Sequence, residues 1–286
     1  MYNIELQNKI LDIFKEYKKI CEENNLRYYA IGGTCIGTIR HKGFIPWDDD
    51  IDVAMPIDDY EKFRRIAKTE LHGKYRLIDY EEDNNRTSNF LKMQDITTTF
   101  VEEKEIKRLN RYKGVFIDIM PITAINKNSI KARQLKLRFF INAKLNENIK
   151  IPYKCKTKLK GKIFWILSHV LFILKNKDHY SKKFDKLCKK YKISEENDIL
   201  FPWRIPLRKP YSNVFNYNDF KETCEMPFED TTIAVPIGYD NYLKKDFGDY
   251  MKLPPESKRV CHNPAILDLE KSYLTYIEEA RKDKNE

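Results

Sequence analysis

The strongest chemical feature of the chain is a run of aspartates within the sequence W-D-D-D-I-D-V-A-M, residues 47–55. Side chains alternate along a strand, so a strand over 50–55 directs Asp48, Asp50 and Asp52 to one face and the apolar residues to the other. Three carboxylates on one face repel each other unless cations lie between them, and carboxylate oxygens suit Mg²⁺ or Mn²⁺. We therefore predict these three aspartates as metal ligands, with Asp50 and Asp52 also catalytic.

A glycine pair lies about fifteen residues before the aspartates, between a short apolar run at 29–31 and a predicted helix over 34–41. Such a pair lets backbone N–H groups approach a phosphate closely, and the helix dipole adds to the attraction. Two cationic candidates end this helix, and a third lies in L-K-M-Q-D, although solvent-exposed roles are the alternative for all three. The predicted phosphate- and donor-binding residues are Gly32, Gly33, Thr34, Arg40, His41 and Lys92.

A single carboxylate, Asp118, interrupts the apolar sequence G-V-F-I-D-I-M-P at 114–121. A carboxylate inside an apolar strand must be paired or must bind something, because an unpaired buried charge is costly. The alternative is a structural aspartate that is hydrogen-bonded to the backbone.

These sequences resemble one known family. G-G-T followed by R-H-K-G-F-I-P-W-D-D-D-I-D-V is similar to the signature of the LicD family of the nucleotidyltransferase superfamily, which includes bacterial phosphocholine transferases and relatives of the fukutins. F-I-D-I-M-P also resembles the family, which makes Asp118 the third acidic residue, either metal ligand or general base. F-G-D-Y-M-K-L-P-P-E resembles the C-terminal signature, with Asp249 and His262 as its site residues and Phe247 where tyrosine is usual. The resemblance covers 27–56, 114–121 and 227–262.

The resemblance implies an activity. The donor would be CDP-choline or a similar CDP-linked compound, and phosphocholine would pass to a hydroxyl of a lipid-linked cell-surface glycan, such as lipopolysaccharide, or of a teichoic acid precursor. Metal ions would neutralise the diphosphate while the hydroxyl attacks in line. An aromatic cage would suit the quaternary ammonium, and Trp203 and Tyr211 are candidates for it.

Several other functions share these features. CDP-ribitol or CDP-glycerol could replace CDP-choline as the donor. A D-x-D glycosyltransferase would use the same metal chemistry on a nucleotide-sugar, and a non-catalytic binding module would not need the carboxylates at all. An EF-hand loop also begins D-x-D-x-D, but Val53 stands where that loop requires glycine.

The pattern of elements predicts an α+β fold, with a nucleotidyltransferase-like mixed sheet flanked by helices and a basic helical insertion. Apolar residues at helical spacing predict a helix over 3–23, and similar patterns predict helices from 56 to 71 and over 239–247. Strands are expected at 26–31, 50–55, 75–80, 89–94, 114–121 and 226–236. The predicted parts are a catalytic core at 1–127, a basic helical insertion at 128–200 and a C-terminal part at 201–286 that completes the catalytic domain.

The positive charge of the chain is concentrated in one segment. The 286 residues carry a net charge of +10, and residues 131–192 hold nineteen Lys and Arg against three acidic residues. No nucleic-acid-binding motif accompanies this charge, so nucleic acid is not an expected partner. The six cysteines form no C-x-x-C pair, which predicts free thiols in a reducing cytosol.

Residues 163–174, I-F-W-I-L-S-H-V-L-F-I-L, form an apolar run inside the basic segment. The run is too short to span a bilayer of about 30 Å, and the chain shows no signal peptide. An apolar stretch with tryptophan and flanking lysines suits shallow burial at a membrane surface. We therefore expect a cytoplasmic protein, peripheral on the inner face of the cell membrane, with a buried core helix as the alternative. The predicted membrane contacts are Trp165, Leu167 and Phe172.

Overall fold

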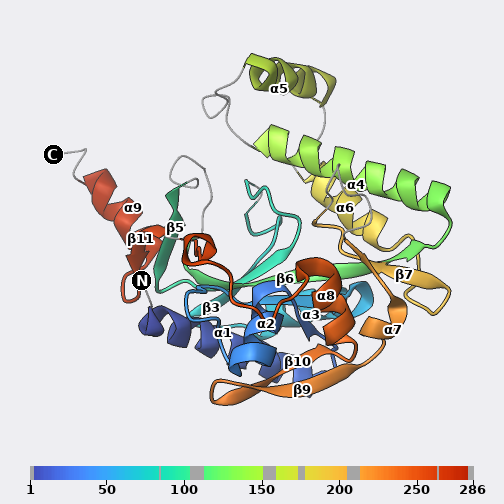
Figure 1. Ribbon diagram of the computed structural model, residues 1–286. Coiled ribbons are helices and arrows are strands. Elements are labelled where there is room, and N and C mark those ends of the chain that lie inside the picture. The colour runs from blue at the N-terminus through green and yellow to red at the C-terminus, as the bar shows by residue number, and fades with distance from the viewer. Residues whose placement is uncertain are drawn as a thin grey trace.

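A mixed, curled β-sheet forms the centre of the protein in the computed structural model (Figure 1). The structure describes residues 3–83, 85–103, 113–150, 159–172, 178–204, 213–262 and 264–282, without the side chains of 129, 160, 170–172 and 280–282. Five strands follow the order β1-β2-β6-β4-β3, and β7 and β8 extend the sheet from β6. The strands are β1 (Tyr29–Ala30), β2 (Asp52–Pro56), β3 (Tyr75–Ile78), β4 (Leu91–Asp95), β6 (Val115–Asn126), β7 (Asn197–Leu200) and β8 (Val214–Phe215).

The long central strand β6 determines how the sheet is built. Its first half pairs in parallel with β2 and antiparallel with β4, and its second half pairs antiparallel with β7. The sequence predicts only 114–121, but apolar residues continue to Ile125, and such a run fits a strand buried on both faces. The prediction of a mixed sheet in an α+β fold is confirmed, while β7 and β8 were not predicted.

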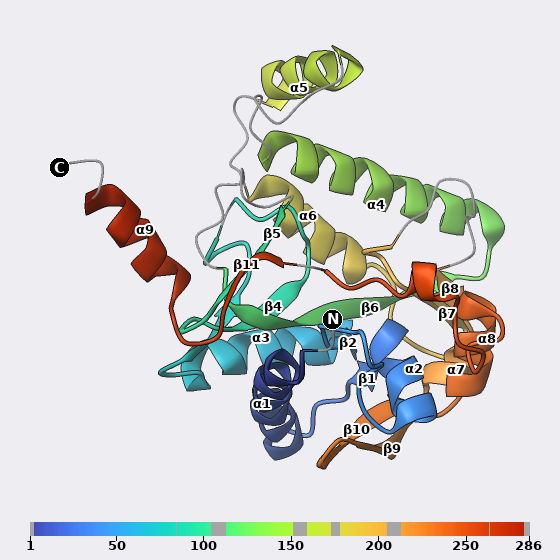
Figure 2. The ribbon, with the colours of Figure 1, turned by 60° about the vertical axis from the view of Figure 1, so that its left-hand side comes forward.

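Helices cover both faces of the sheet (Figure 2). α1 (Ile4–Glu23) and α3 (Ile57–Glu70) lie on one face, and α4 (Ser129–Lys150) and α6 (His179–Cys188) lie on the other. α5 (Leu159–Phe172) lies beyond α4, away from the sheet. The predicted first helix is confirmed, because α1 begins after the N-cap Asn3, whose side chain accepts a hydrogen bond from the Leu6 N–H.

The C-terminal part adds two small sheets. The expected strand 226–236 is instead a hairpin of β9 (Thr223–Phe228) and β10 (Thr231–Pro236), with Glu229 at positive φ in the turn. β11 (Pro264–Asp268) pairs antiparallel with β5 (Thr99–Glu102), so the end of the chain returns to the sheet region. The predicted helix 239–247 is confirmed as α8. The remaining elements are α2 (Gly32–His41), α7 (Tyr217–Phe220), the 3₁₀ turn Glu256–Lys258 and α9 (Tyr273–Lys282).

One hydrophobic core connects the sheet with the helices of the basic segment. Phe139 of α4 and Phe184 of α6 are buried in the same core cluster as β2 and β6. Because β7 pairs with β6, residues 197–200 of the predicted insertion belong to the sheet. The division at 127 and 200 stays a prediction. The cysteines in the described residues are free thiols, namely Cys21, Cys35, Cys188, Cys224 and Cys261.

Candidate active site

Three neighbouring strands bring Asp52, Asp118 and Lys92 into one row. Asp52 opens β2 and lies opposite Asp118 of β6, which lies opposite Lys92 of β4. The Lys92 Nζ is 2.7 Å from the Asp118 Oδ1 and 3.0 Å from the centre of the Phe116 ring. The row therefore places two carboxylates side by side, one of them neutralised by a lysine that the chain itself supplies.

The expected strand positions of Asp48 and Asp50 are wrong. β2 begins at Asp52, so both residues lie in the loop before the strand and do not share its face by alternation. Neither neighbouring strand pairs with them, because β1 offers antiparallel partners only to Val53 and Ala54 and the parallel ladder with β6 begins at Asp52.

The loop nevertheless brings the carboxylates within electrostatic reach of each other. Burial, followed by repulsion from Asp50, raises the pKa of Asp48 to about 8. The pKa of Asp52 is raised well above its usual value by burial and then by Asp50 and Asp118. Burial also raises the pKa of Asp50, with Asp118 adding to the shift. The four predicted acidic residues therefore form one cluster of mutually repelling groups.

The glycine pair lies directly against this cluster. The helix begins two residues earlier than predicted, and both glycines belong to the first turn of α2. A Cβ on Gly33 would lie 2.6 Å from the Asp48 Oδ2, and one on Gly32, whose φ is +57°, would lie 3.6 Å from the Asp52 Oδ2. Gly33 therefore lets the helix start lie this close to Asp48, and Gly32 supplies the positive φ that a side chain would disfavour.

The backbone of the α2 start is partly engaged. The Gly32 N–H donates to the hydroxyl of Tyr242 on α8 at 2.8 Å. The Thr34 hydroxyl accepts a hydrogen bond from the Asp52 N–H at 2.8 Å and so ties the helix to β2. The N–H groups of Gly33 and Thr34 lie in the first turn, where a helix supplies no carbonyl partner. A phosphate at these two groups would lie beside the carboxylates.

The C-terminal segment contacts the acidic loop through Asp49, which is not among the predicted site residues. The buried Asp49 carboxylate accepts from the His262 backbone N–H at 3.0 Å and lies 2.9 Å from its Nδ1. The Asp50 Oδ2 is 3.7 Å from the same Nδ1. The hydrogen bond to Asp49 raises the pKa of His262 to about 9, and its two carboxylate neighbours thereby favour an imidazolium. The position of Asp49 inside the aspartate run was the only sequence signal.

Arg40 and His41 lie at the far end of α2. The Arg40 Nε donates to the His41 Nε2 at 2.9 Å, and its guanidinium donates to the Tyr250 carbonyl at 2.7 Å. Burial lowers the pKa of both groups. Asp249 precedes Tyr250 and is exposed, so these residues gather around the loop after α8. α2 ends at His41, and the C-cap residue Lys42 has a φ of +57°, in the left-handed region that closes many helices.

Of the aromatic residues suggested for a cage, Trp203 is a structural neighbour of the sheet. Its Nε1 donates to the Pro121 carbonyl of β6 at 3.1 Å, and its ring stacks on Phe201. Tyr211 lies outside the described residues. The Arg259 guanidinium lies over the ring of Trp47, another aromatic residue of the signature, 5.0 Å from the ring centre. This contact joins the acidic loop to the C-terminal segment.

α5 presents apolar side chains to solvent. The Trp165 ring stacks on His169, with 3.6 Å between the ring centres. Within the described residues, no helix combines the length and apolar character needed to cross a membrane. The side chain of Phe172 lies outside the described part. The exposed apolar residues of α5 are Leu159, Ile163, Phe164, Ile166 and Leu167.

Comparison with known proteins matches this region to one family. Residues 25–144 match the family model described as LicD/FKTN/FKRP, nucleotidyltransferase domain. The lipopolysaccharide cholinephosphotransferase LicD of Haemophilus influenzae is 32% identical over 277 residues, which are 91% of this chain and 95% of that protein. An uncharacterized protein of Rickettsia typhi is 33% identical over 24% of this chain and 22% of its own. One of Rickettsia prowazekii is 25% identical over 39% of this chain and 38% of its own.

Proposed function

Because the chain belongs to the LicD family, we propose that it is a phosphotransferase that moves phosphocholine from CDP-choline, or a similar CDP-linked donor, to a hydroxyl of lipopolysaccharide or another lipid-linked cell-surface glycan. The observation that carries the proposal is the row of Asp52, Asp118 and Lys92 across three strands, together with the acidic loop. The row lies inside the region that matches the family model.

A divalent cation, Mg²⁺ or Mn²⁺, fits the donor groups of the site. Buried carboxylates that raise each other's pKa values lose this repulsion when a cation binds between them. In the described part of the chain, no three His, Cys, Asp or Glu side chains already form a group arranged to hold a metal. Mg²⁺ commonly needs only one or two carboxylates, because substrate phosphates complete its shell. Asp52 and Asp118 are the first candidates, with Asp48 and Asp50 beside them.

Residues of the chain would bind the phosphate and accept the proton of the attacking hydroxyl. A bound cation would supply charge neutralisation for the diphosphate of the donor. The N–H groups of Gly33 and Thr34 would hold a phosphate oxygen, and the α2 dipole would favour its charge. Asp118, if it is not a metal ligand, would accept the proton of the attacking hydroxyl. Lys92, which already neutralises Asp118, would turn toward the phosphate when a cation takes its place.

His262 has a positioning role in this proposal. Its backbone N–H and ring both bind Asp49, and Asp50 lies next to the ring. The C-terminal segment would thereby hold the acidic loop in the geometry that the donor requires. Arg40 and His41 would bind the more distant part of the donor, near the loop that contains Asp249.

The alternatives differ in donor and acceptor. CDP-ribitol, CDP-glycerol and a teichoic acid precursor are compatible with the same carboxylates. A nucleotide-sugar donor is less favoured, because a relative that aligns over most of the chain is named a cholinephosphotransferase.

We also propose that α5 attaches the protein to the cytoplasmic face of the membrane. Its apolar side chains are exposed, with Ile163 at 50% and Leu167 at 54%. Exposure of this kind in a helix surrounded by a basic segment suits insertion at the headgroup boundary of an anionic leaflet. The acceptor, if it is linked to a lipid, would then lie in the same plane.

A donor screen tests the proposed function. Purified protein with Mg²⁺ and lipopolysaccharide is incubated separately with CDP-choline, CDP-ribitol, CDP-glycerol and a UDP-sugar, and CMP, UMP and UDP are quantified. We expect CMP from CDP-choline, dependent on the acceptor and abolished by EDTA and by Asp52→Asn. UDP released from the nucleotide-sugar, with no CMP from any CDP donor, would contradict the proposal.

A further inference from the structure

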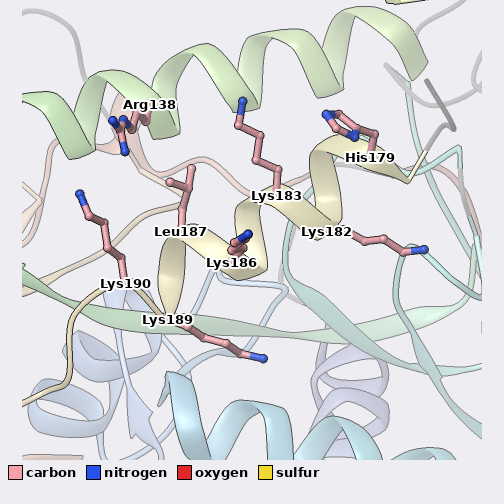
Figure 3. Close-up of a pocket in the computed structure, with 8 residues that line it drawn as sticks. All are labelled: Arg138, His179, Lys182, Lys183, Lys186, Leu187, Lys189 and Lys190. Atoms are coloured by element: carbon pink, nitrogen blue, oxygen red, sulfur yellow. The ribbon is translucent and has the colours of Figure 1, made fainter. Parts of the chain in front are cut away.

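A cationic groove lies between α4 and α6, outside the candidate active site (Figure 3). Its volume is about 810 Å³, which falls in the size range of small-molecule sites. Arg138 extends from α4 and Lys183 from α6 into the space between the two helices. Leu187 contributes an apolar side chain to it. The lining residues are Arg138, His179, Lys182, Lys183, Lys186, Leu187, Lys189 and Lys190.

The charge of the groove is largely uncompensated by the protein. Of the eight lining residues that the structure describes, six are Lys or Arg and none is acidic. Lys189 pairs with Glu61, but in the described part of the chain Arg138, Lys183 and Lys186 form no ion pair.

The acidic residues of the same helices have other partners. Asp185 of α6 binds Arg64 at 3.1 Å and accepts a hydrogen bond from the Tyr80 hydroxyl. Glu147 of α4 pairs with Lys144. Like charges held on facing helices repel each other, and the repulsion is relieved when an anion enters between them.

The groove is separate from the acidic cluster along β6. The Thr123 hydroxyl of β6 donates a hydrogen bond to the carbonyl of Cys188. Cys188 is the last residue of α6, and the lining residues Lys189 and Lys190 follow it in the chain. Thr123 and Asp118 are five residues apart on one strand, or about 17 Å at the usual rise. An anion at the Cys188 end of the groove would therefore not occupy the site of the reacting phosphate.

We propose that the α4–α6 groove binds a phosphate or diphosphate group on the acceptor. A phosphate offers several strong acceptor oxygens, which suit the planar guanidinium of Arg138 on α4 and the ammonium of Lys183 on α6. The concave shape suits a discrete group better than the plane of a bilayer. Among the described residues, the lining includes no Trp, Tyr or Phe on which a base could stack, which disfavours single-stranded nucleic acid.

The assignment of this phosphate to the acceptor rests on the proposed function. It explains why the basic charge lies on α4 and α6, between the exposed helix α5 and the sheet that carries the carboxylates (Figure 1). A lipid-linked glycan held by its phosphate in the groove would extend its sugars toward β6. The groove would thereby select phosphorylated acceptors over neutral ones.

Titration calorimetry with inorganic pyrophosphate in EDTA tests the groove itself. The groove variant Arg138→Gln/Lys183→Gln is compared with the control Lys19→Gln/Lys221→Gln, which removes the same charge from exposed positions of α1 and the α7 end. We expect wild type, control and Asp52→Asn to bind alike, and the groove variant to bind at least tenfold more weakly. Equal binding by both double variants, loss of binding in Asp52→Asn alone, or no binding by wild type would overturn the proposal.

Two further measurements identify the source of the phosphate. With lipopolysaccharide as acceptor, the groove variant should show a KM at least tenfold higher for the acceptor and an unchanged KM for CDP-choline. Prior treatment of the acceptor with phosphatase should remove this difference. The groove variant should also bind vesicles of phosphatidylglycerol and phosphatidylcholine as wild type does. If the variant lost vesicle binding together with pyrophosphate binding, the cations would be assigned to the bilayer and the proposal would be overturned. Absence of any transfer would contradict the proposed function, and the pyrophosphate titration would still decide the groove.

Discussion

The variant Gly33→Ala tests whether the close approach of α2 to the acidic loop is needed for catalysis. A Cβ at this position would lie 2.6 Å from the Asp48 Oδ2, whereas ordinary contact begins at 3.4 Å. The clashing atom is the end of a side chain, so the loop can give way and the fold should survive. Asp48 must then move by about 1 Å, and a misplacement of this size in an active site costs about 100-fold in rate.

The helix itself should gain from the substitution. Alanine is favoured over glycine in a helix by about 0.5–1 kcal/mol, so the free energy of unfolding should not fall. Gly161→Ala in α5 is the matched control, because nothing lies within 4 Å of a Cβ built there. Both variants should therefore unfold at or above the wild-type temperature, but only Gly33→Ala should lose activity.

The assay is acceptor-dependent release of CMP from CDP-choline, measured as kcat/KM, with thermal unfolding on the same samples. We expect a loss of about 100-fold for Gly33→Ala and activity within twofold of wild type for Gly161→Ala. A Gly33→Ala enzyme within threefold of wild type would refute the link between this glycine, Asp48 and the reaction. Unfolding of Gly33→Ala at a much lower temperature would refute the claim that the loop absorbs the clash.

Three other predictions follow from the acidic cluster and from α5. Asp50→Asn, Asp52→Asn and Asp118→Ala should each abolish transfer, and the two asparagine variants should do so without lowering the unfolding temperature. Asp58→Ala, at an exposed helix start, should be active. An inactive Asp58→Ala beside an active Asp118→Ala would show that the third carboxylate is misassigned. The pKa of Asp48 is raised to about 8 in the folded state, so its carboxylate destabilises the metal-free protein increasingly as pH rises from about 4 to 8. Urea unfolding in EDTA should therefore show that the free energy of unfolding of Asp48→Asn rises by at least about 1 kcal/mol relative to wild type over that range. A difference in the free energy of unfolding between the two proteins that stays constant with pH would contradict this raised pKa. In co-sedimentation with anionic vesicles, Trp165→Ser/Leu167→Ser should lose binding and wild-type binding should weaken with salt; equal binding to neutral vesicles would favour a packing role for α5.

Local patterns in the sequence were sufficient for α1, α8 and the first part of the central strand. The apolar spacing of α1 and α8 predicted both helices, and the apolar run around Asp118 predicted β6. The positions of Asp48 and Asp50 were misjudged because alternation applies only where a strand has partners. β1 is two residues long and pairs only with Val53 and Ala54, and the ladder with β6 begins at Asp52, so neither neighbour pairs with Asp50.

Contacts across the chain could not be predicted from spacing. Asp49 and His262 are 213 residues apart, and nothing near either residue indicates the other. The same holds for Tyr242, whose hydroxyl accepts from Gly32, 210 residues away. The α4–α6 groove also depends on packing, because the sequence shows its lysines only as part of a long basic segment.

The most direct test of the central claim follows the transferred group itself. Lipopolysaccharide is incubated with the enzyme, Mg²⁺ and CDP-choline deuterated on the choline methyl groups, and both products are analysed by mass spectrometry. The account predicts a glycan that carries deuterated phosphocholine, formed in equal amount with CMP and absent with Asp52→Asn. Release of CMP without labelled glycan, or a labelled glycan formed equally well by Asp52→Asn, would contradict it.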